Sequence, residues 1–498
     1  MRRALLTTLT LLAAACAPAL ASAASVRVAT STELTAAIAQ AQPGDTITLA
    51  GGSYGAVAIT GKGGPAADLT LKGEPGASIS GGTITGSQRI VLDGLTVAPV
   101  SAEALITVAS SSVVWFKSMT LNGGAGGAGV SLELAASATG VQVVNSVFRY
   151  CASPYCIKTS SPDVVIQGNN FDNLDDTDAV HGFGGGIIRG NRMDHALPHG
   201  NGNHNDFIQI GAGGPWVIDA NWMGVRTGGA ASIWLDPING GLIHDAVISN
   251  NVVTGHQAGQ YVGIFVGGDG TSADLLPRNV TVINNTVMSG LSNSLRFGRA
   301  YATLPVEQRP LVVNNTGERL LEQCDRIRTS HNVFITGEAC GPSDVIGNPH
   351  VDALTGAPSA ASTLLINRGD PTGAPTTDFF GYARTVGLPD IGAIELGAGP
   401  AAPKPPAKQH ARAKLVAVSV RRGLHTALVR VRTSNSTRVT VTVLLRGRIV
   451  AKAEHKGSAK HGVRFGLKTP RHGAVVVRVR AFGPGGGALR LVTVKARP

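Results

Sequence analysis

A short phrase that ends in asparagine recurs along the middle of the chain and limits what the chain can fold into. It reads Val-Ile-Gln-Gly-Asn-Asn-Phe at 165–171 and returns in related form at 187–193, 217–223, 247–253 and 282–287. Repetition of short alternating strands at a regular period is typical of a solenoid. The phrases are β-branched and rich in Gly and Asn, with almost no helical periodicity. We therefore predict an all-β fold, a right-handed parallel β-helix, in which equivalent positions of successive coils stack in rows. The stacked asparagines would be separated by 22, 30, 30, 34 and 30 residues, at Asn169, Asn191, Asn221, Asn251, Asn285 and Asn315.

The first residues of the chain have the pattern of a secretory signal peptide. Arg2 and Arg3 precede an apolar run, and Ala-Ser-Ala at 21–23 offers a cleavage site, so we expect residues 1–23 to be removed. Cys16 leaves a lipoprotein alternative open. No later segment is long and apolar enough to span a membrane. The other four cysteines lack the spacing of a zinc site, and in a secreted chain they predict two local disulfides, within the pairs Cys151 and Cys156 and Cys324 and Cys340.

Charge divides the chain into two parts. The formal net charge is +12, yet 22 Lys or Arg residues and a single acid, Glu454, follow residue 403, which leaves 21 basic and 30 acidic residues before it. Alternating runs at the end of the chain predict a small, basic antiparallel β-sandwich over 413–498. A Pro-, Ala- and Lys-rich linker at 397–412 would join it to the acidic β-helix of 24–396.

The charge asymmetry predicts that the basic module binds an anionic cell-wall or glycan polymer. Nucleic acid is a weaker candidate because the module contains no recognised nucleic-acid motif. We expect a secreted, cell-wall-associated monomer.

A helical cap is expected across the first coil of the solenoid, because an open end exposes apolar strand edges. At the start, Leu34 and Ile38 share one face of an amphipathic helix over Thr30 to Gln42, with Ser31 or Thr32 as its N-cap.

A row of outward-facing side chains should follow from strand alternation, since neighbouring residues of a strand point to opposite faces. After each asparagine phrase comes a second short strand with an aliphatic residue that we expect to point inward. The residue after it would then point outward, and neighbouring rungs lie about 4.8 Å apart. This predicts a column of Lys158, His181, Gln209, Trp234, Phe265 and Arg296.

The column has the contents of a glycan-binding groove. Trp234 and Phe265 offer flat faces for sugar rings, and Gln209 offers an amide. Lys158 or His181 would serve as a base, and either Arg296 or Ca²⁺ bound by Asp178 and Asp206 would neutralise a substrate carboxylate.

A second row places Asp178 over Asp206. Two carboxylates on adjacent rungs repel each other, so either one is protonated or both bind a cation. Together with Asp175 and Asp176 they could hold Ca²⁺ through oxygen ligands. They could instead accept hydrogen bonds only from turn amides.

The most polar insertion of the solenoid spans 194–206 and should overhang the column. It contains His195, His199 and His204, which we expect to contact substrate. A transition-metal site and simple solvation are the alternatives for these three side chains.

Two segments resemble known families. The opening Leu-Thr-Ala-Ala-Ile-Ala-Gln-Ala-Gln-Pro-Gly-Asp at 34–45 resembles the start of the pectate-lyase-like superfamily, and is especially similar to the alginate lyase and chondroitinase B family. The Lys-Ser-Glu and Arg…Gly-His catalytic phrases of those lyases are missing from the chain. Asp-Phe-Phe-Gly-Tyr-Ala-Arg at 378–384 and Asp-Ile-Gly-Ala-Ile-Glu at 390–395 resemble a choice-of-anchor Q domain, over 362–396. These resemblances imply an extracellular β-helix protein.

Three functions fit these patterns. The first is a lyase that cleaves a uronate glycan by β-elimination, which needs a base and a group that neutralises the carboxylate. The second is a glycoside hydrolase that uses Asp178 and Asp206, with Asp236 in reserve. The third is a non-catalytic extracellular protein that binds glycans, since fold alone does not imply function.

Overall fold

The computed structural model describes residues 23–494 with gaps. Most of the predicted signal peptide, residues 1–22, and the greater part of the predicted linker lie outside the described residues. The gaps are 100–103, 124–128, 152–153, 176, 198–205, 225–230, 255–261, 269, 289–292, 321–322, 385–386, 399–413, 423–425, 435–437, 446–447, 457–459, 461, 469–474 and 483–487. The chain divides into two compact units, residues 1–401 and 402–498.

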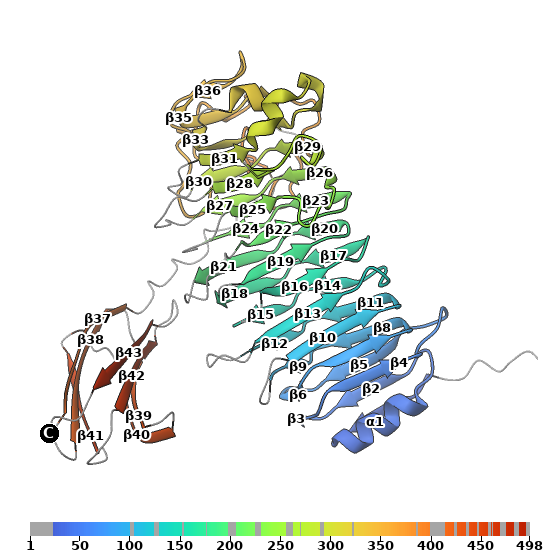
Figure 1. Ribbon diagram of the computed structural model, residues 1–498, viewed down its shortest axis with the longest axis vertical. Helices are drawn as coiled ribbons and strands as arrows, with labels where there is room; N and C mark the ends of the chain where they lie inside the picture. The colour runs from blue at the N-terminus through green and yellow to red at the C-terminus, as the bar shows by residue number, and fades with distance from the viewer. Residues whose placement is uncertain are drawn as a thin grey trace, which may run out of the picture. The chain divides into compact units, whose positions relative to one another are not determined.

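The first unit is a parallel β-helix, as predicted. The coils contribute strands to three parallel sheets, and Figure 1 shows the equivalent strands of successive coils stacked in chain order.

Within the described residues, sheet 1 contains β1 (Ser25–Val28), β2 (Thr46–Leu49), β5 (Leu69–Gly73), β8 (Gln88–Asp93), β11 (Ser112–Lys117), β14 (Gln142–Val144), β17 (Val164–Gln167), β20 (Gly186–Arg189), β23 (Trp216–Asp219), β26 (His244–Ser249), β29 (Arg278–Ile283), β32 (Leu311–Val313) and β34 (Arg328–Ser330). Sheet 2 contains β3 (Gly52–Ser53), β6 (Ala77–Ile79), β9 (Thr96–Val97), β12 (Thr120–Asn122), β15 (Val147–Arg149), β18 (Asn170–Asp175), β21 (Arg192–Leu197), β24 (Trp222–Met223), β27 (Val252–Thr254), β30 (Thr286–Met288), β33 (Thr316–Leu320), β35 (Val333–Gly337) and β36 (Val345–Ile346). Sheet 3 contains β4 (Val57–Thr60), β7 (Gly82–Thr85), β10 (Ala104–Ala109), β13 (Val130–Leu134), β16 (Tyr155–Thr159), β19 (Asp178–Gly182), β22 (Ile208–Ile210), β25 (Ala231–Leu235), β28 (Val262–Val266) and β31 (Asn293–Phe297).

The asparagine phrase forms the bend between sheets 1 and 2. Each asparagine side chain is buried, and its Nδ2 donates to the Oδ1 of the asparagine on the next coil, as from Asn191 to Asn221 at 2.9 Å. The same Oδ1 accepts the backbone N–H of the preceding asparagine, and the ladder runs on to Asn332. Buried polar groups of a bend must be paired, so the repeated asparagine satisfies the backbone of every coil.

The residue before each ladder asparagine explains the rest of the phrase. Its backbone has a positive φ, a conformation that Gly adopts freely and Asn tolerates. Gly or Asn fills most of these positions, and Ala220 and His331 fill the others: Gly168, Gly190, Ala220, Asn250, Asn284, Asn314 and His331.

We expect Asn221→Ala to lower the free energy of unfolding of the β-helix by about 3 kcal/mol, because it leaves buried amide and carbonyl groups without partners. Asn221 Nδ2 donates to Ile188 O at 2.9 Å, and Asn221 Oδ1 accepts from Asn191 N at 3.0 Å. The shift is measured by denaturant unfolding. Gln167→Ala, which removes an exposed amide from β17, should leave the curve in place; equal shifts in both variants would contradict the ladder's role.

The first coil differs from the prediction in two details. Helix α1 spans Ser31–Gln40, and Leu34 and Ile38 are its buried residues. Its N-cap is Thr30, whose hydroxyl accepts from Glu33 N, so the predicted caps Ser31 and Thr32 were wrong by one or two positions. Strand β1 precedes the helix and pairs with β2, which was not predicted.

The segment that resembles a choice-of-anchor Q domain packs along the outside of the last coils. Its Ala393 N donates to Thr286 Oγ1, its Asp390 O accepts from Asn284 Nδ2, and its Ile394 packs with Val252. Three short 3-10 helices precede it, η1 (Arg299–Thr303), η2 (Val306–Gln308) and η3 (Cys324–Arg326). The assignment to that domain type stays a prediction, while the contacts show a segment that covers the asparagine bends from outside.

The second unit contains two antiparallel sheets around its own core of Val, Leu and Phe side chains, as predicted. One sheet has the order β37 (Lys414–Arg422), β38 (Thr426–Ser434) and β41 (Val463–Lys468). The other has the order β40 (Arg448–Lys456), β39 (Arg438–Leu445), β42 (Val475–Phe482) and β43 (Ala488–Val494). Among the residues that the structure describes, no helix of either unit has the length and apolar character needed to cross a membrane.

Candidate active site on sheet 3

The predicted column exists as a row of register partners on sheet 3. Lys158 pairs with His181, and the row continues through Gln209, Trp234 and Phe265 to Arg296. The aliphatic residue before each of them is completely buried, as strand alternation requires: Ile157, Val180, Ile208, Ile233, Ile264 and Leu295.

His181 and Asp178 form a pair at one end of the column. His181 Nδ1 lies 3.1 Å from Asp178 Oδ2. The imidazole stacks on Phe183 with ring centroids 4.7 Å apart and meets the Tyr155 ring edge-on. A carboxylate at Nδ1 favours the tautomer that carries its proton there. The lone pair of His181 is then on Nε2, a buried atom for which no described residue supplies a hydrogen bond.

Asp178 and Asp206 stack on adjacent rungs, as predicted, and they also satisfy backbone amides. Asp178 Oδ1 accepts from Asp206 N at 2.9 Å, and Asp206 Oδ1 accepts from Ala231 N at 2.7 Å. Burial, opposed by the hydrogen bond from His181 and aided by the charge of Asp206, raises the pKa of Asp178 to about 6. Asp178 is therefore ionised at neutral pH and takes up a proton in mildly acidic solution.

The predicted calcium site stays a prediction, because the described residues include only two of its four carboxylates. Asp178 is 3% exposed and Asp206 is fully buried, and each already accepts a backbone amide. Asp176 and the side chain of Asp175 lie outside the described residues. The same burial keeps Asp178 and Asp206 from flanking a glycosidic bond as a hydrolase would require.

Lys158 lies on the rung next to His181 and is held as a cation. Its Nζ is 3.3 Å from the Tyr155 hydroxyl and 3.7 Å from Glu133 Oε1. Partial burial acts to lower the pKa of Lys158, but the hydrogen bond to Tyr155 and the charge of Glu133 outweigh it and raise this pKa. An ammonium with a raised pKa is a poor base and a good partner for an anion, so His181 is the better base of the two.

The aromatic part of the column is stacked and largely covered. The rings of Trp234 and Phe265 are parallel with centroids 5.8 Å apart, and the Arg296 guanidinium lies 5.0 Å from the Phe265 ring centre. Gln209 is 4% exposed and Phe265 is 7% exposed, so the middle of the column is not the open groove that we predicted. Arg296 lies four rungs from His181, roughly 19 Å at the spacing of strands, too far to neutralise the sugar that His181 would attack.

A surface hollow of about 520 Å³ opens beside these rings. Trp234, Phe265 and Asp236 line it together with the segment 270–272. Asp236 Oδ1 accepts from Gly268 N and from the Thr271 hydroxyl at 2.8 Å each. A flat aromatic surface beside a polar wall is a suitable place for one sugar ring.

His195 lies on a different sheet from the column. It belongs to β21 of sheet 2, where its Nδ1 is 2.7 Å from Asp172 Oδ1, so its predicted place in a loop over the column was wrong. The strand extends further than the polar composition indicated. His199 and His204 lie outside the described residues.

Several residues of the site were not predicted. Glu133 precedes Lys158 in the same row of register partners, and Tyr155 lies three residues before Lys158 on its own strand. Extending the row by one coil would have found Glu133. Phe183 follows the strand of His181 and gave no separate signal.

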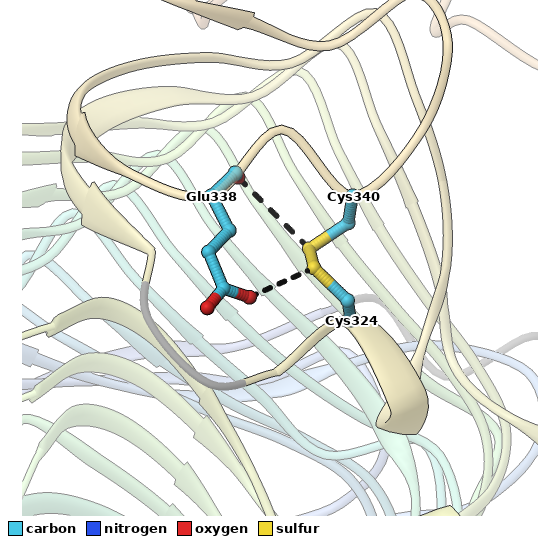
Figure 2. Close-up of side chains that lie close together, drawn as sticks. All are labelled: Cys324, Glu338 and Cys340. Carbon is cyan, nitrogen blue, oxygen red and sulfur yellow. Dashed lines mark hydrogen bonds between the residues drawn. A yellow bond between two sulfur atoms is a disulfide. The ribbon is translucent and has the colours of Figure 1, made fainter.

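Both predicted disulfides are present, Cys151–Cys156 and Cys324–Cys340. Figure 2 shows the second with Glu338, whose Oε2 lies 3.1 Å from Cys324 Sγ. Within the described part of the chain, Cys324, Glu338 and Cys340 are the three side chains with potential metal-ligand atoms that lie close together. A cysteine binds a metal ion as a thiolate, and a disulfide has none, so the group is a covalent bridge between η3 and the segment that follows β35. Two disulfides fit a secreted protein.

Comparisons with known proteins were made for sequence and for structure. No protein-family model and no curated protein matches the chain in sequence. Among solved structures, the pectate lyase Pel9A is similar with a TM-score of 0.42 and 16% identity, over 75% of this chain and 96% of that one. The surface protein and adhesin PfbA of Streptococcus pneumoniae gives 0.38 and 14%, over 60% and 86% of the two chains.

A mannuronic-acid-specific family 6 polysaccharide lyase from human gut microbiota gives a TM-score of 0.34 and 14% identity, over 64% of this chain and 77% of that one. Lyases and an adhesin are thus both among the similar structures. At this level of identity the likeness concerns the parallel β-helix and does not distinguish between their chemistries.

Proposed function

We propose that this protein is a secreted polysaccharide lyase that cleaves an acidic glycan by β-elimination on sheet 3. The observation that carries the proposal is a His–Asp pair with a protonated lysine on the adjacent rung. β-Elimination needs a base for the proton next to the uronate carboxylate and a cation that neutralises this carboxylate. His181 and Lys158 supply the base and the cation from adjacent strands, which lie about 4.8 Å apart.

The proposed reaction assigns one task to each group. Neutral His181 takes the α-proton on Nε2, while Asp178 holds the ring and stabilises the imidazolium that forms. The electrons of the broken C–H bond form the C=C bond, and the glycosidic C–O bond breaks. Protonated His181 returns its proton to the leaving oxygen. Lys158 stabilises the negative charge that develops on the uronate carboxylate.

The products distinguish the proposal from hydrolysis. Elimination leaves one fragment with an unsaturated uronate end and adds no water, whereas hydrolysis adds one water and leaves two saturated ends. Mass spectrometry of products from polygalacturonate and alginate reads this difference. Fragments that carry one added water would overturn the proposal, and binding without any cleavage would favour the non-catalytic alternative, which the buried Gln209 and Phe265 support.

We expect Trp234→Ala to raise KM by about ten-fold with little change in kcat, because the hollow beside Trp234 would bind a sugar away from the reacting bond. Trp115→Ala, on β11 of sheet 1, is the matched control and should leave KM unchanged. Steady-state kinetics of both variants test this. A fall in kcat with constant KM in Trp234→Ala would instead place Trp234 beside the bond that is cleaved.

A further inference from the structure

The outward face of β37, β38 and β41 carries a concentrated positive charge. Along β38, buried and exposed residues alternate, with Val429 and Val431 in the core and Arg430 and Arg432 exposed. The neighbouring strands add further exposed cations to this face, which we call the arginine face: Arg421, Arg430, Arg432, Arg464 and Lys468. The three strands contain no acidic residue.

The strand register places like charges against each other. Arg430 lies directly opposite Arg464, and Arg432 is two residues further along the same strand. Like charges directly opposite each other on a sheet are destabilising. A bound anion between the two guanidinium groups would remove this repulsion, so the pairing indicates an anionic partner.

The second sheet of the module also pairs two exposed cations, Arg438 with Lys456, but an acid lies on the same strand as Lys456. This acid is Glu454, the single acid after residue 403, which lies on β40 opposite Thr440. Arg478 and Arg480 on its central strand are half-buried. The exposed cations that no acid on the same sheet offsets are therefore those of the arginine face.

We propose that the arginine face binds an acidic polysaccharide through its carboxylate groups. A guanidinium matches a planar carboxylate with two parallel hydrogen bonds, which a lysine cannot do. Single-stranded nucleic acid is bound largely by stacking on aromatic side chains. Where the structure describes the side chains of these three strands, the exposed positions are occupied by Ala, Gly, Leu, Ser and Thr besides the cations. The inference concerns a unit with its own core and does not depend on the reaction on sheet 3.

The test uses the full chain in a His181→Ala background, so that turnover does not consume the probe. Binding to immobilised polygalacturonate is measured at low salt for Arg430→Gln/Arg432→Gln/Arg464→Gln. The charge-matched control is Arg438→Gln/Lys452→Gln/Lys456→Gln on the other sheet, whose three cations are also exposed. Unfolding curves check that both variants fold.

We expect the arginine-face variant to bind about ten-fold more weakly, as for the loss of three exposed charge contacts. The control should lose much less, and added salt should weaken the parent protein's binding. Equal losses in both variants would overturn the proposal in favour of unspecific charge attraction, and no loss in either would overturn it outright. Tighter binding to single-stranded DNA than to polygalacturonate, lost in the same variant, would make the partner a nucleic acid.

Discussion

His181→Ala should lower kcat/KM on a polyuronate by about 10³-fold, within the range that a positioned general base contributes, while the unfolding curve keeps its midpoint. The imidazole makes its described contacts with side chains of the site, Asp178, Phe183 and Tyr155, so its loss should leave the coils intact. Initial rates and denaturant unfolding measure the two effects. Full activity in this variant would show that His181 is not the base of the reaction.

The pH profile gives an independent readout of the same pair. The pKa of Asp178 is raised to about 6, so the Asp178–His181 pair gains a proton as the pH falls through about 6, and kcat/KM should rise with pH across this range. Because the folded-state pKa lies above the usual value, ionisation of Asp178 costs stability. The protonated Asp178 carboxyl therefore stabilises the folded state. This contribution to the free energy of unfolding is complete below about pH 4 and is lost as the pH rises through about 6.

Asp178→Asn separates positioning from folding. The amide keeps an oxygen for the Asp206 N–H and cannot take up the proton. We expect a lower kcat and a displaced acid limb in this variant, with Asp178 acting through His181 as a positioning residue. An unchanged pH profile would mean that another group sets the acid limb.

Arg384→Met should produce the largest loss of stability, about 3–5 kcal/mol, because it leaves a buried carboxylate without its counter-charge. Arg384 Nη1 lies 3.0 Å from Glu395 Oε2, and both side chains are almost completely buried. Its Nη2 donates to Asn250 Oδ1 at 2.9 Å and to the carbonyls of Gly392 and Ala393. The guanidinium therefore joins the closing segment to an asparagine bend of the coils.

Two variants make this prediction sharp. Arg384→Met/Glu395→Gln removes both charges of the pair and should recover part of the lost stability, since the Glu395 carboxylate is no longer buried without its counter-charge. Arg27→Met breaks the exposed pair between Arg27 and Glu74 and should not move the unfolding curve measurably. Limited proteolysis of the closing segment should accelerate in Arg384→Met alone. A stability loss no larger than that of Arg27→Met would contradict the role of Arg384 in holding the closing segment against the coils.

The parts of the fold that follow local rules could be predicted from the sequence. Asn169, Asn191 and Asn221 stack because every coil needs the same amide at the same bend, and His181 faces outward because Val180 faces inward. These are consequences of period-two alternation and of repeat length. The disulfides were predictable because the cysteines lie close together in sequence.

The parts that depend on distances between sheets could not be predicted. His195 was expected over the column, but strand β21 continues to Leu197 and takes it to sheet 2 beside Asp172. Alternation gives the face of a residue, not what covers that face, so the burial of Gln209 was missed. The path of the closing segment depends on contacts such as Arg384 with Asn250, 134 residues apart.

The most direct test of the account is the ultraviolet absorbance of unsaturated uronate ends, followed while the protein is incubated with polygalacturonate, alginate and other uronate polymers, with calcium and then with a chelator. The account predicts that absorbance rises on at least one polymer with the parent protein and stays flat with His181→Ala. A rise that survives the chelator would agree with Lys158 as the neutralising cation. A flat signal from the parent protein on every polymer, or a rise that His181→Ala retains in full, would contradict the assignment of sheet 3 as a lyase site.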